Sequence, residues 1–285
     1  MVNVGLIGLG RIGKVIAKSI LEHPGLNLVL VVHRTGSKDK YVGQDLGDVL
    51  NIRKTGIEIK GSHNLSNELA KAKPDVIVDF TNPEACLKNL KTAAIHKTNF
   101  IVGTTGFTRE ELATIEHLAY RNRISIVYAP NLTTGINVLL NLVKKLTNLL
   151  PDWDTEIIEI HHKHKKDAPS GTAVKLAEEI GRERGIPVET SVLYSRKGIQ
   201  PRKTGEITVH AIRGGGVVGV HEVMFISENE KISIKHESLN RNAFADCLMK
   251  VIDFINNNKP GYYTVEEALN LVEFTEHEET GIVDF

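Results

Sequence analysis

Short apolar runs alternate with helix-like patterns along the first third of the chain, and this alternation constrains the fold more than any other feature. Helical patterns, such as residues 11–23, separate strand-like runs at residues 2–8, 26–33, 75–80, 100–103 and 124–130. Strands that alternate with helices predict an α/β fold with a doubly wound parallel sheet of the Rossmann type.

The starts of two helices can be predicted from their first residues. Asn82 is a helix N-cap candidate and is followed by Pro83, a residue favoured at the first helical position. Thr108 and Glu111 have the spacing of a capping box. We therefore expect helices to begin directly after residues 82 and 108.

The pattern changes after Asn131. We expect helices over residues 135–150, 171–185 and 241–258, and strands over residues 155–162, 206–213, 216–227 and 231–238. Short turns with Gly or Asn separate the last three strands, which predicts that they are antiparallel. The sequence thus predicts a dinucleotide-binding domain of residues 1–131 plus 241–285. A second, α+β domain of residues 132–240 is inserted into it.

Composition excludes several classes of function. The chain has 285 residues, 35 Lys and Arg against 35 Asp and Glu, and no bulk charge that would attract nucleic acid or an anionic membrane. Cys86 and Cys247 have no metal-site spacing and predict no disulfide framework. We see no signal peptide, and no apolar run reaches the roughly 18 residues of a membrane span. A cytoplasmic protein with reduced thiols is expected.

A glycine-rich loop, "GLGRIG" (8–13), joins the first predicted strand to the first predicted helix. The first glycine permits a tight turn, the second lets the backbone approach a pyrophosphate, and the third lets helix and strand pack closely. The strand–turn–helix context strengthens an otherwise weak motif. We predict a dinucleotide site made of Gly8, Gly10, Arg11, Ile12 and Gly13.

The residues after the second predicted strand bear on the choice of cofactor. NAD-specific sites usually carry an acid there, which accepts a hydrogen bond from the ribose 2′-OH. This chain has His33 and Arg34 instead. Arg34 is either a solvated surface residue or a bidentate partner for a 2′-phosphate. The sequence favours NADPH and leaves NADH open.

Residues 161–173, "HHKHKKDAPSGTA", combine histidines and lysines with a helix start. Three interpretations compete. His162 and His164 on one strand face could bind a metal, although the neighbouring lysines disfavour a cation, and we predict no metal. The segment could be a basic surface loop. It could also bind an anionic substrate and donate a proton to it.

The third interpretation explains more of the segment than the other two do. Ser170 is a plausible N-cap, so a helix N-terminus that favours anions lies beside the cations. The amides of Gly171 and Thr172 can hold a carboxylate. Histidine can deliver a proton near neutral pH, and lysine supplies positive charge where negative charge develops.

Five sequence blocks carry a resemblance to a known family: "EIHHKHKKDAPSGTA" (159–173), "GTTG" (103–106), "APNLTTGIN" (129–137), "RGGGVVGVHEVMF" (213–225) and "HESLNRNAFA" (236–245). In these blocks, and in their order, the chain resembles the 4-hydroxy-tetrahydrodipicolinate reductase (dihydrodipicolinate reductase) family of the diaminopimelate and lysine pathway. The resemblance extends from the first strand to about residue 260, and the long central block is its most specific part.

The resemblance implies roles for individual residues. His161 matches the proton donor of the family and Lys165 its second catalytic group. His236 and Arg241 lie in matched blocks that support the site or the hinge. The implied substrate-binding residues are His162, Ser170, Gly171 and Thr172. Loops at the nicotinamide end of the cofactor correspond to Gly103, Thr104, Thr105, Ala129, Pro130, Asn131 and Leu132.

The implied reaction is hydride transfer from NADPH or NADH to a ring carbon of a small cyclic dicarboxylate, with protonation of the neighbouring carbon. One rival is a dehydrogenase of the same architecture that acts on another amino or imino acid. The other rival is a nucleotide-sensing or metal-binding protein without catalysis. Activity on the cyclic dicarboxylate and a measurement of bound metal would separate these possibilities.

A homotetramer is expected, held by the inserted domain, which would combine substrate binding with tetramerisation. Val218 and Val220 share one parity of their predicted strand and Val217 has the other, so the sheet is apolar on both faces. A sheet of this kind needs cover on both faces, and a symmetric copy can cover the second one. The resembled family assembles in this way.

Overall fold

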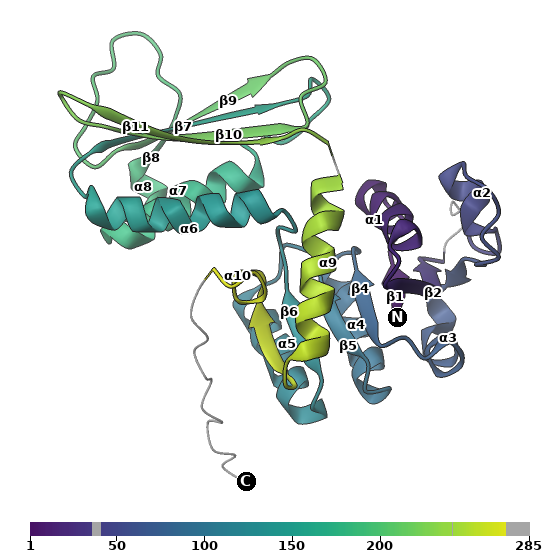
Figure 1. The fold of residues 1–285 in the computed structure, drawn as a ribbon. Helices are drawn as coiled ribbons and strands as arrows, with labels where there is room; N and C mark the ends of the chain where they lie inside the picture. Colours follow the sequence, from purple (N-terminus) through teal and green to yellow (C-terminus); the bar gives the residue numbers. More distant parts are fainter. Residues whose placement is uncertain (36–40, 241, 272–285) are drawn as a thin grey trace. The chain divides into compact units, whose positions relative to one another are not determined.

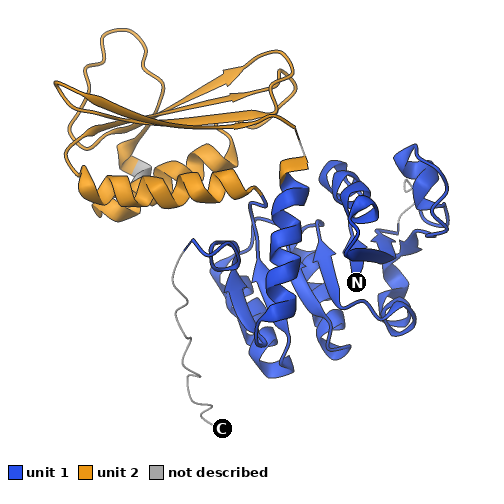
Figure 2. Ribbon diagram, in the orientation of Figure 1, with its two compact units in different colours: residues 1–132, 244–285 blue, residues 133–243 orange. Residues whose placement is uncertain are grey.

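The computed structural model describes residues 1–35, 41–240 and 242–271. The chain divides into two compact units, drawn in blue and orange in Figure 2. Unit 1 consists of Met1–Leu132 and Phe244–Phe285, and unit 2 of Thr133–Ala243. Arg241, which the sequence placed near the site, lies outside the described residues.

Unit 1 is built on a parallel sheet of seven strands in the order β12-β6-β5-β4-β1-β2-β3 (Figure 1). The predicted α/β class is confirmed, and so are the five predicted strands. The short β3 and the edge strand β12 were not predicted. The strands are β1 (Val2–Ile7), β2 (Leu26–His33), β3 (Lys60–Gly61), β4 (Val76–Asp79), β5 (Asn99–Val102), β6 (Ser125–Tyr128) and β12 (Gly261–Thr264).

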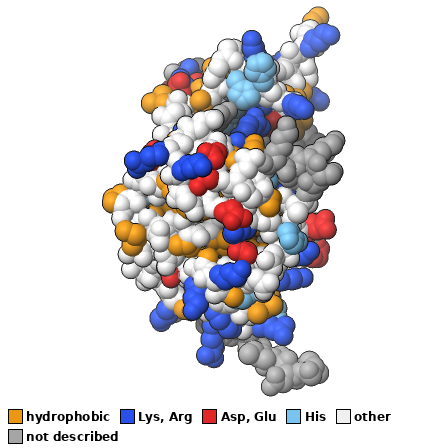
Figure 3. Space-filling model, turned by 90° about the vertical axis from the view of Figure 1, so that its right-hand side faces the viewer, with side chains coloured by type: hydrophobic (Ala, Val, Ile, Leu, Met, Phe, Trp, Pro, Cys, Tyr) orange, Lys and Arg blue, Asp and Glu red, His pale blue; other side chains and the backbone are white. Residues whose placement is uncertain are grey.

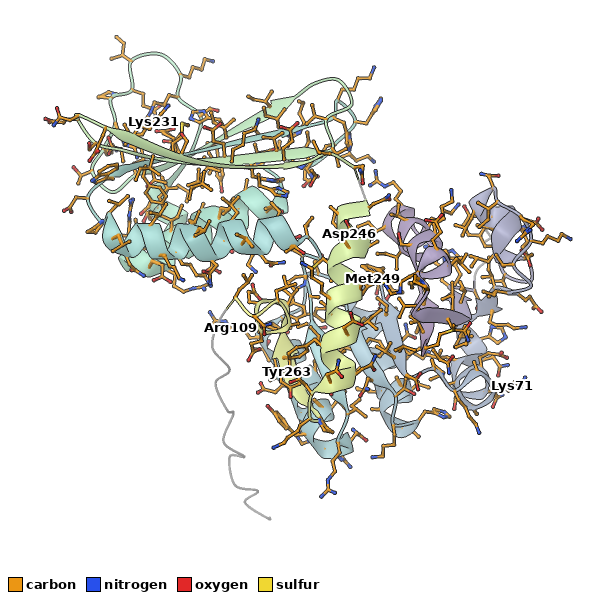
Figure 4. The ribbon with its side chains drawn as sticks, in the orientation of Figure 1. Lys71, Arg109, Lys231, Asp246, Met249 and Tyr263 are labelled. Carbon is orange, nitrogen blue, oxygen red and sulfur yellow. The ribbon has the colours of Figure 1, made fainter. Side chains whose placement is uncertain are left out.

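Helices cover both faces of this sheet, which explains why its central strands are almost continuously apolar. On one face, side chains of α1 (Arg11–Glu22) and α9 (Asn242–Asn257) pack against the sheet in one hydrophobic cluster. Met249 of α9 and Tyr263 of β12, both labelled in Figure 4, pack against this cluster. A second cluster holds α3 (Leu65–Ala72), α4 (Pro83–Ile95) and α5 (Arg109–Asn122) on the other face. The remaining elements of unit 1 are the short α2 (Leu46–Leu50), η1 (Ser62–Asn64) and α10 (Val265–Ala268).

Both predicted helix starts are confirmed. The Asn82 side chain accepts a hydrogen bond from the backbone N–H of Ala85, and Pro83 opens α4. At the start of α5, Thr108 Oγ1 accepts from the N–H of Glu111, and the Glu111 carboxylate accepts from the N–H of Thr108. These side chains replace backbone partners that a helix lacks at its first turn.

Unit 2 contains a mixed sheet of five strands in the order β11-β10-β7-β9-β8, with helices on one of its faces (Figure 1). Side chains of α6 and α7 form a hydrophobic cluster with the inward residues of the sheet, such as Ile157, Val209 and Val223. The strands are β7 (Asp154–His161), β8 (Val192–Tyr194), β9 (Ile207–Arg213), β10 (Gly219–Ile226) and β11 (Lys231–Ser238). The helices are α6 (Thr134–Leu149), α7 (Gly171–Arg184) and α8 (Val188–Ser191).

The three strands β9, β10 and β11 alternate in direction as predicted, but the pairing of β9 with β10 that this implied is wrong. β10 and β11 are antiparallel neighbours, but β9 runs parallel to β7, which lies between β9 and β10. The connection from β9 to β10 crosses the carboxyl end of β7 and is bonded there. The N–H of Gly214 donates to the carbonyl of His161 (3.0 Å), and the N–H of Lys163 donates to the carbonyl of Gly215 (3.2 Å).

Two strand boundaries also differ from prediction. β7 ends at His161, so His162 and His164 do not share a strand face and lie in the turn that follows. β10 begins at Gly219, so Val217 and Val218 precede it, whereas Val220 lies opposite Ile160 on the sheet face away from the helices. In the parts of both units that the structure describes, no helix has the length and apolarity needed to cross a membrane.

Candidate active site

The glycine loop of unit 1 has the shape that a dinucleotide pyrophosphate requires. Gly8 has φ +101°, and a Cβ there would lie 2.5 Å from the carbonyl oxygen of Phe80. A Cβ on Gly13 would lie 1.9 Å from the carbonyl oxygen of Gly8. A Cβ on Gly10 would meet nothing within 4 Å, so the loop is open where a phosphate would approach the start of α1. The residues therefore fit the predicted cofactor.

The position of this loop in the sheet supports the same assignment. β1 lies between β2 and β4, so the strand order reverses between β1 and β4. Ligands of doubly wound sheets bind outside the carboxyl ends of the strands at this switch point. Arg11 is exposed on the first turn of α1, and Ile12 packs in part against the core.

His33 contacts the glycine loop directly. The N–H of Leu9 donates to His33 Nδ1 (3.3 Å), and the His33 ring packs on Tyr41 with 5.4 Å between ring centroids. The Lys14 ammonium lies 3.1 Å from the Tyr41 hydroxyl and 4.5 Å from the centre of its ring. Arg34 is exposed directly after β2. Sequence reasoning missed Lys14 and Tyr41, although a lysine in the first turn after a glycine loop was a readable signal.

A buried carboxylate organises the loops after β4 and β5. Asp79 is fully buried, and its carboxylate accepts from Thr81, from Thr104 Oγ1 (3.0 Å) and from Asn89 Nδ2 (2.8 Å). Burial raises the pKa of Asp79, and these hydrogen bonds oppose that rise. Thr104 is thereby fixed inward, while Thr105 is exposed. The network orders the loop that contains both threonines.

Some of the other predicted cofactor residues are buried in the core, and others are partly exposed at the surface. A Cβ on Gly103 would lie 2.4 Å from the Phe80 ring, so this loop needs a glycine for close packing. Ala129 and Leu132 are buried in the core, and any ligand would meet their backbone rather than their side chains. Pro130 and Asn131 are partly exposed.

In unit 2, a buried carboxylate holds the first histidine of the basic segment. His161 Nδ1 lies 2.5 Å from Glu159 Oε2 at the end of β7. The Glu159 side chain is fully buried, and the His161 side chain is 12% exposed. The guanidinium of Arg213, from β9, donates to both carboxylate oxygens of Glu159 at 2.9 and 2.7 Å. The backbone N–H of Ser170 donates to Glu159 Oε1 at 2.9 Å.

These donors determine the ionisation of Glu159. Burial opposes the charged form, but hydrogen bonds from Arg213, His161 and the N–H of Ser170 outweigh it and lower the pKa of Glu159. The site therefore contains a buried carboxylate that stays ionised and points at a histidine. Sequence reasoning missed Glu159 and Arg213, because their separation along the chain hides their pairing.

The N-terminus of α7 lies beside this carboxylate. Ser170 is buried, and its hydroxyl accepts from the N–H of Ala173 (3.2 Å), as the N-cap prediction required. No acidic residue lies in the first turn of α7, so its positive helix end is not neutralised from within. A Cβ on Gly171 would meet nothing within 4 Å, which leaves space at the helix end next to Thr172.

A second histidine packs against the first but has a different environment. The rings of His161 and His221 lie edge to face with 5.3 Å between centroids. His221 Nε2 lies 3.0 Å from Ser170 Oγ. Burial and the nearby charge of His161 lower the pKa of His221 to about 3. Burial also lowers the pKa of His236, which pairs with His221 across β10 and β11.

The remaining residues of the basic segment lie in the turns between β7 and α7. The Lys165 ammonium lies 2.8 Å from the Asp167 carboxylate, and this lysine is the first cause of the lowered pKa of Asp167. His162 and His164 have ring centroids 6.4 Å apart. Among the described residues, no group of three or more His, Cys, Asp or Glu side chains could hold a metal ion. Basic, acidic and apolar side chains intermingle on the face in Figure 3, consistent with the balanced charge.

A dinucleotide-binding sheet and a unit that presents a carboxylate-held histidine define a nicotinamide-dependent oxidoreductase. Family models agree with this class: "Dihydrodipicolinate reductase, N-terminus" matches residues 2–132 and "Dihydrodipicolinate reductase, C-terminus" matches residues 135–269. The chain therefore belongs to the dihydrodipicolinate reductase family.

Curated relatives from two organisms carry one name. The chain is 39% identical over 275 residues to the 4-hydroxy-tetrahydrodipicolinate reductase of Methanocaldococcus jannaschii, a match that covers 96% of this chain and 99% of the relative. It is 38% identical over 263 residues to the reductase of the same name from Methanothermobacter thermautotrophicus, covering 92% and 96%. These relatives support the reductase interpretation and neither of its rivals.

Solved structures share the fold. The dipicolinate-bound dihydrodipicolinate reductase of Paenisporosarcina sp. TG-14 has a TM-score of 0.75 and 24% identity, and the match covers 95% of this chain and 100% of that one. The amine dehydrogenase of Mycobacterium smegmatis has a TM-score of 0.63 and 14% identity, covering 93% and 95%. At these identities the likeness establishes architecture and not substrate.

Proposed function

We propose that this protein reduces 4-hydroxy-tetrahydrodipicolinate to tetrahydrodipicolinate with NAD(P)H, a step of the diaminopimelate and lysine pathway. The 4-hydroxyl group leaves as water together with a proton from the neighbouring ring carbon, and the conjugated imine that results takes up one hydride and one proton. The observation that carries the proposal is the Glu159–His161 pair at the end of β7, beside the N-terminus of α7. An anionic ring that must be protonated needs both a positive cradle and an acid.

In this proposal the residues of unit 2 bind the dicarboxylate and deliver the proton. His161 donates its Nε2 proton to the ring carbon next to the one that accepts the hydride. Lys165 offsets the negative charge of the substrate and the charge that develops on its ring. The α7 N-terminus at Ser170, Gly171 and Thr172 holds a carboxylate, with His162 beside it.

In unit 1 the proposed cofactor site is the glycine loop, His33 with Arg34, and the loops after β5 and β6. When bound, the reduced nicotinamide supplies the hydride. Arg34 and Lys14 provide positive charge for a 2′-phosphate, and no acid stands at position 33 to repel it. We therefore propose NADPH as at least an equal of NADH. Unit 1 is the proposed dinucleotide-binding domain and unit 2 the proposed substrate-binding and tetramerisation domain.

A homotetramer in the cytoplasm is part of the proposal. The sheet face of unit 2 away from the helices carries an apolar row that can pack against symmetric copies, interrupted by Glu156, His210 and Glu222. The row consists of Ile158, Ile160, Ile212, Val220, Met224 and Ile226. Cys86 and Cys247 are buried in clusters on opposite faces of the unit 1 sheet, so they cannot pair with each other. This arrangement fits a reducing compartment.

The test is oxidation of NADPH by the purified protein, with substrate generated in situ by the synthase that precedes this step. We expect turnover with the cyclic dicarboxylate and none with a panel of acyclic amino and imino acids. Turnover of an acyclic acid without activity on the cyclic dicarboxylate would assign the chain to the rival dehydrogenase class. Stoichiometric bound metal without turnover would support the non-catalytic rival.

A further inference from the structure

The carboxylate that contacts His161 belongs to Glu159, which neither donates the proton nor binds the substrate in the proposed reaction. Glu159 lies two residues earlier on β7 and points to the same sheet face, because side chains alternate along a strand. Its two carboxylate oxygens contact three groups: His161 Nδ1, the Arg213 guanidinium and the backbone N–H of Ser170. An ionised carboxylate accepts hydrogen bonds and donates none.

The direction of the contact follows from this ionisation. Arg213 is always charged and binds Glu159 through two hydrogen bonds, and the pKa of Glu159 lies below its ordinary value. His161 Nδ1 must then be the donor, with its proton directed at Oε2. The proton that His161 can release to a substrate is consequently the one on Nε2.

We infer that Glu159 is the positioning residue of the proton donor: it fixes His161 in the Nδ1–H tautomer, and its charge stabilises the doubly protonated ring. This inference rests on the proposed function for its catalytic meaning. After His161 has given up the Nε2 proton, its Nδ1–H remains bound to Glu159, so the ring keeps its orientation between turnovers. Histidines that act as proton carriers depend on such a partner.

The other charged groups around His161 do not duplicate this role. From β9, Arg213 contacts Glu159, and from β10 the neighbouring His221 stays neutral near pH 7 because its pKa is about 3. From the turn before α7, Lys165 is paired with Asp167. From β11, burial lowers the pKa of His236.

The backbone beside His161 Nε2 leaves room for this nitrogen to donate its proton to a substrate. A Cβ on Gly219, the first residue of β10, would lie 3.1 Å from His161 Nε2. That distance is tighter than ordinary van der Waals contact. A glycine at this position therefore leaves Nε2 uncrowded, while Nδ1 on the opposite side of the ring is held by Glu159.

The resting protein gives the first test, which needs no substrate. Histidine ring nitrogens of the ¹⁵N-labelled full-length protein are observed by NMR, with His161 assigned from the signals lost in a His161→Gln variant. We expect neutral His161 to be protonated at Nδ1. Protonation at Nε2 in the neutral form would overturn the inference, whether or not the protein reduces the proposed substrate.

The second test uses turnover with the cyclic dicarboxylate and NADPH. In Glu159→Gln, kcat falls at least about tenfold, and the alkaline limb of its pH profile moves to lower pH, because the opposite charge that contacts the acid is lost. KM for NADPH stays unchanged. Glu159→Asp, which keeps the charge, restores the position of the limb. A limb that stays in place in Glu159→Gln would overturn the inference.

Glu179→Gln is the matched control. Glu179 is a buried carboxylate of unit 2 that pairs with Arg182 (2.8 Å) and Lys144 (3.3 Å), and no histidine bond to it occurs among the contacts described. Its loss should lower stability and leave both the tautomer of His161 and the pH profile as in the unmodified protein. If the pH profile of turnover shifts in Glu179→Gln as much as in Glu159→Gln, Glu159 has only a structural role.

Discussion

Two histidines that touch each other have opposite electrostatic surroundings. His161 faces an ionised carboxylate, whereas His221 is 4% exposed, faces the hydroxyl of Ser170 and is disfavoured in its charged form. Burial lowers the pKa of His221 to about 3, so this ring stays neutral near pH 7 beside the histidine that contacts Glu159. The surroundings of the two rings therefore fit the proposed role of His161 as proton donor and a neutral state for His221.

His161→Gln should lower turnover by roughly 10²–10⁴-fold, the range expected when a general acid is removed. Binding of NADPH, followed by fluorescence of the bound nicotinamide, should change little. His117→Gln, a change at an exposed position of α5, is the control and should keep full turnover. Near-normal turnover in His161→Gln would remove this residue from the proposed mechanism.

His221 should make unit 2 less stable in mild acid. Its folded pKa of about 3 lies below the ordinary 6.5, so between these values the unfolded chain binds a proton that the folded one excludes. Its contribution to stability is complete above pH 6.5 and is lost as pH falls toward 3. The loss is roughly 2 kcal/mol between about pH 6.5 and pH 5.

Urea unfolding followed by the fluorescence of Trp153 measures this effect. The chain has one tryptophan, and it packs against the core of unit 2. His221→Asn should flatten the fall in stability across this pH window. His236 also has a lowered pKa, so it contributes the slope that remains in the variant. Equal slopes in the variant and the unmodified protein would contradict the assignment.

Arg34→Ala should weaken the binding of NADPH more than that of NADH, because only NADPH carries the 2′-phosphate that we propose Arg34 to contact. The comparison of the two KM values measures the effect. Arg109→Ala, a change at an exposed arginine of α5 (Figure 4), is the control and should alter neither value. An equal loss with both cofactors would leave Arg34 without a role in selectivity.

At the scale of single elements, the start of α7 combines a structural and a binding task. Ser170→Ala removes the N-cap bond to Ala173 and the contact with His221, so stability should fall by about 1–2 kcal/mol. KM for the dicarboxylate should rise as well. Thr108→Ala removes the N-cap of α5 in unit 1 and should lower stability without changing that KM. Steady-state kinetics beside thermal unfolding separates the two effects.

Elements that depend on local sequence could be predicted, and pairings that depend on distant contacts could not. The capping residues Asn82, Thr108 and Ser170 each act within three residues of the backbone that they bind. The neighbour of β9 was not predicted, because β7 is separated from it along the chain by α7, α8 and β8. The two-residue β3 is too short to show a periodic pattern.

The candidate site divides in the same way. The glycine loop and the basic segment are contiguous and could be recognised from their spacing. Glu159 and Arg213 are far apart in sequence, and their bidentate pair is formed only when β7 and β9 align in parallel. His221 reads as an ordinary strand residue until folding brings it against His161. Contacts between residues far apart in sequence therefore complete the site, and such contacts could not be predicted from local sequence patterns.

At the scale of the whole molecule, the chain leaves unit 1 after β6 and returns to it with α9 and β12. β12 pairs in parallel with β6 at the edge of the sheet, and α9 fills the cluster on the face of α1. Unit 2 is thus an insertion whose two ends both join unit 1. An insertion of this kind needs its own core, and unit 2 has one between its sheet and α6 with α7.

The outer face of the unit 2 sheet makes an oligomer testable. Most of its apolar row is partly exposed in a single chain, with Ile212 46% exposed, whereas Val220 is buried. Sedimentation equilibrium should give about four times 31.5 kDa. Ile212→Lys should lower this mass, because a buried ammonium without a partner would oppose association, whereas the single chain can solvate it. Ile95→Lys, at a 76% exposed position of α4, is the control and should keep the tetramer. A stable single chain at micromolar concentration, or a tetramer that tolerates Ile212→Lys, would show that copies do not cover this face.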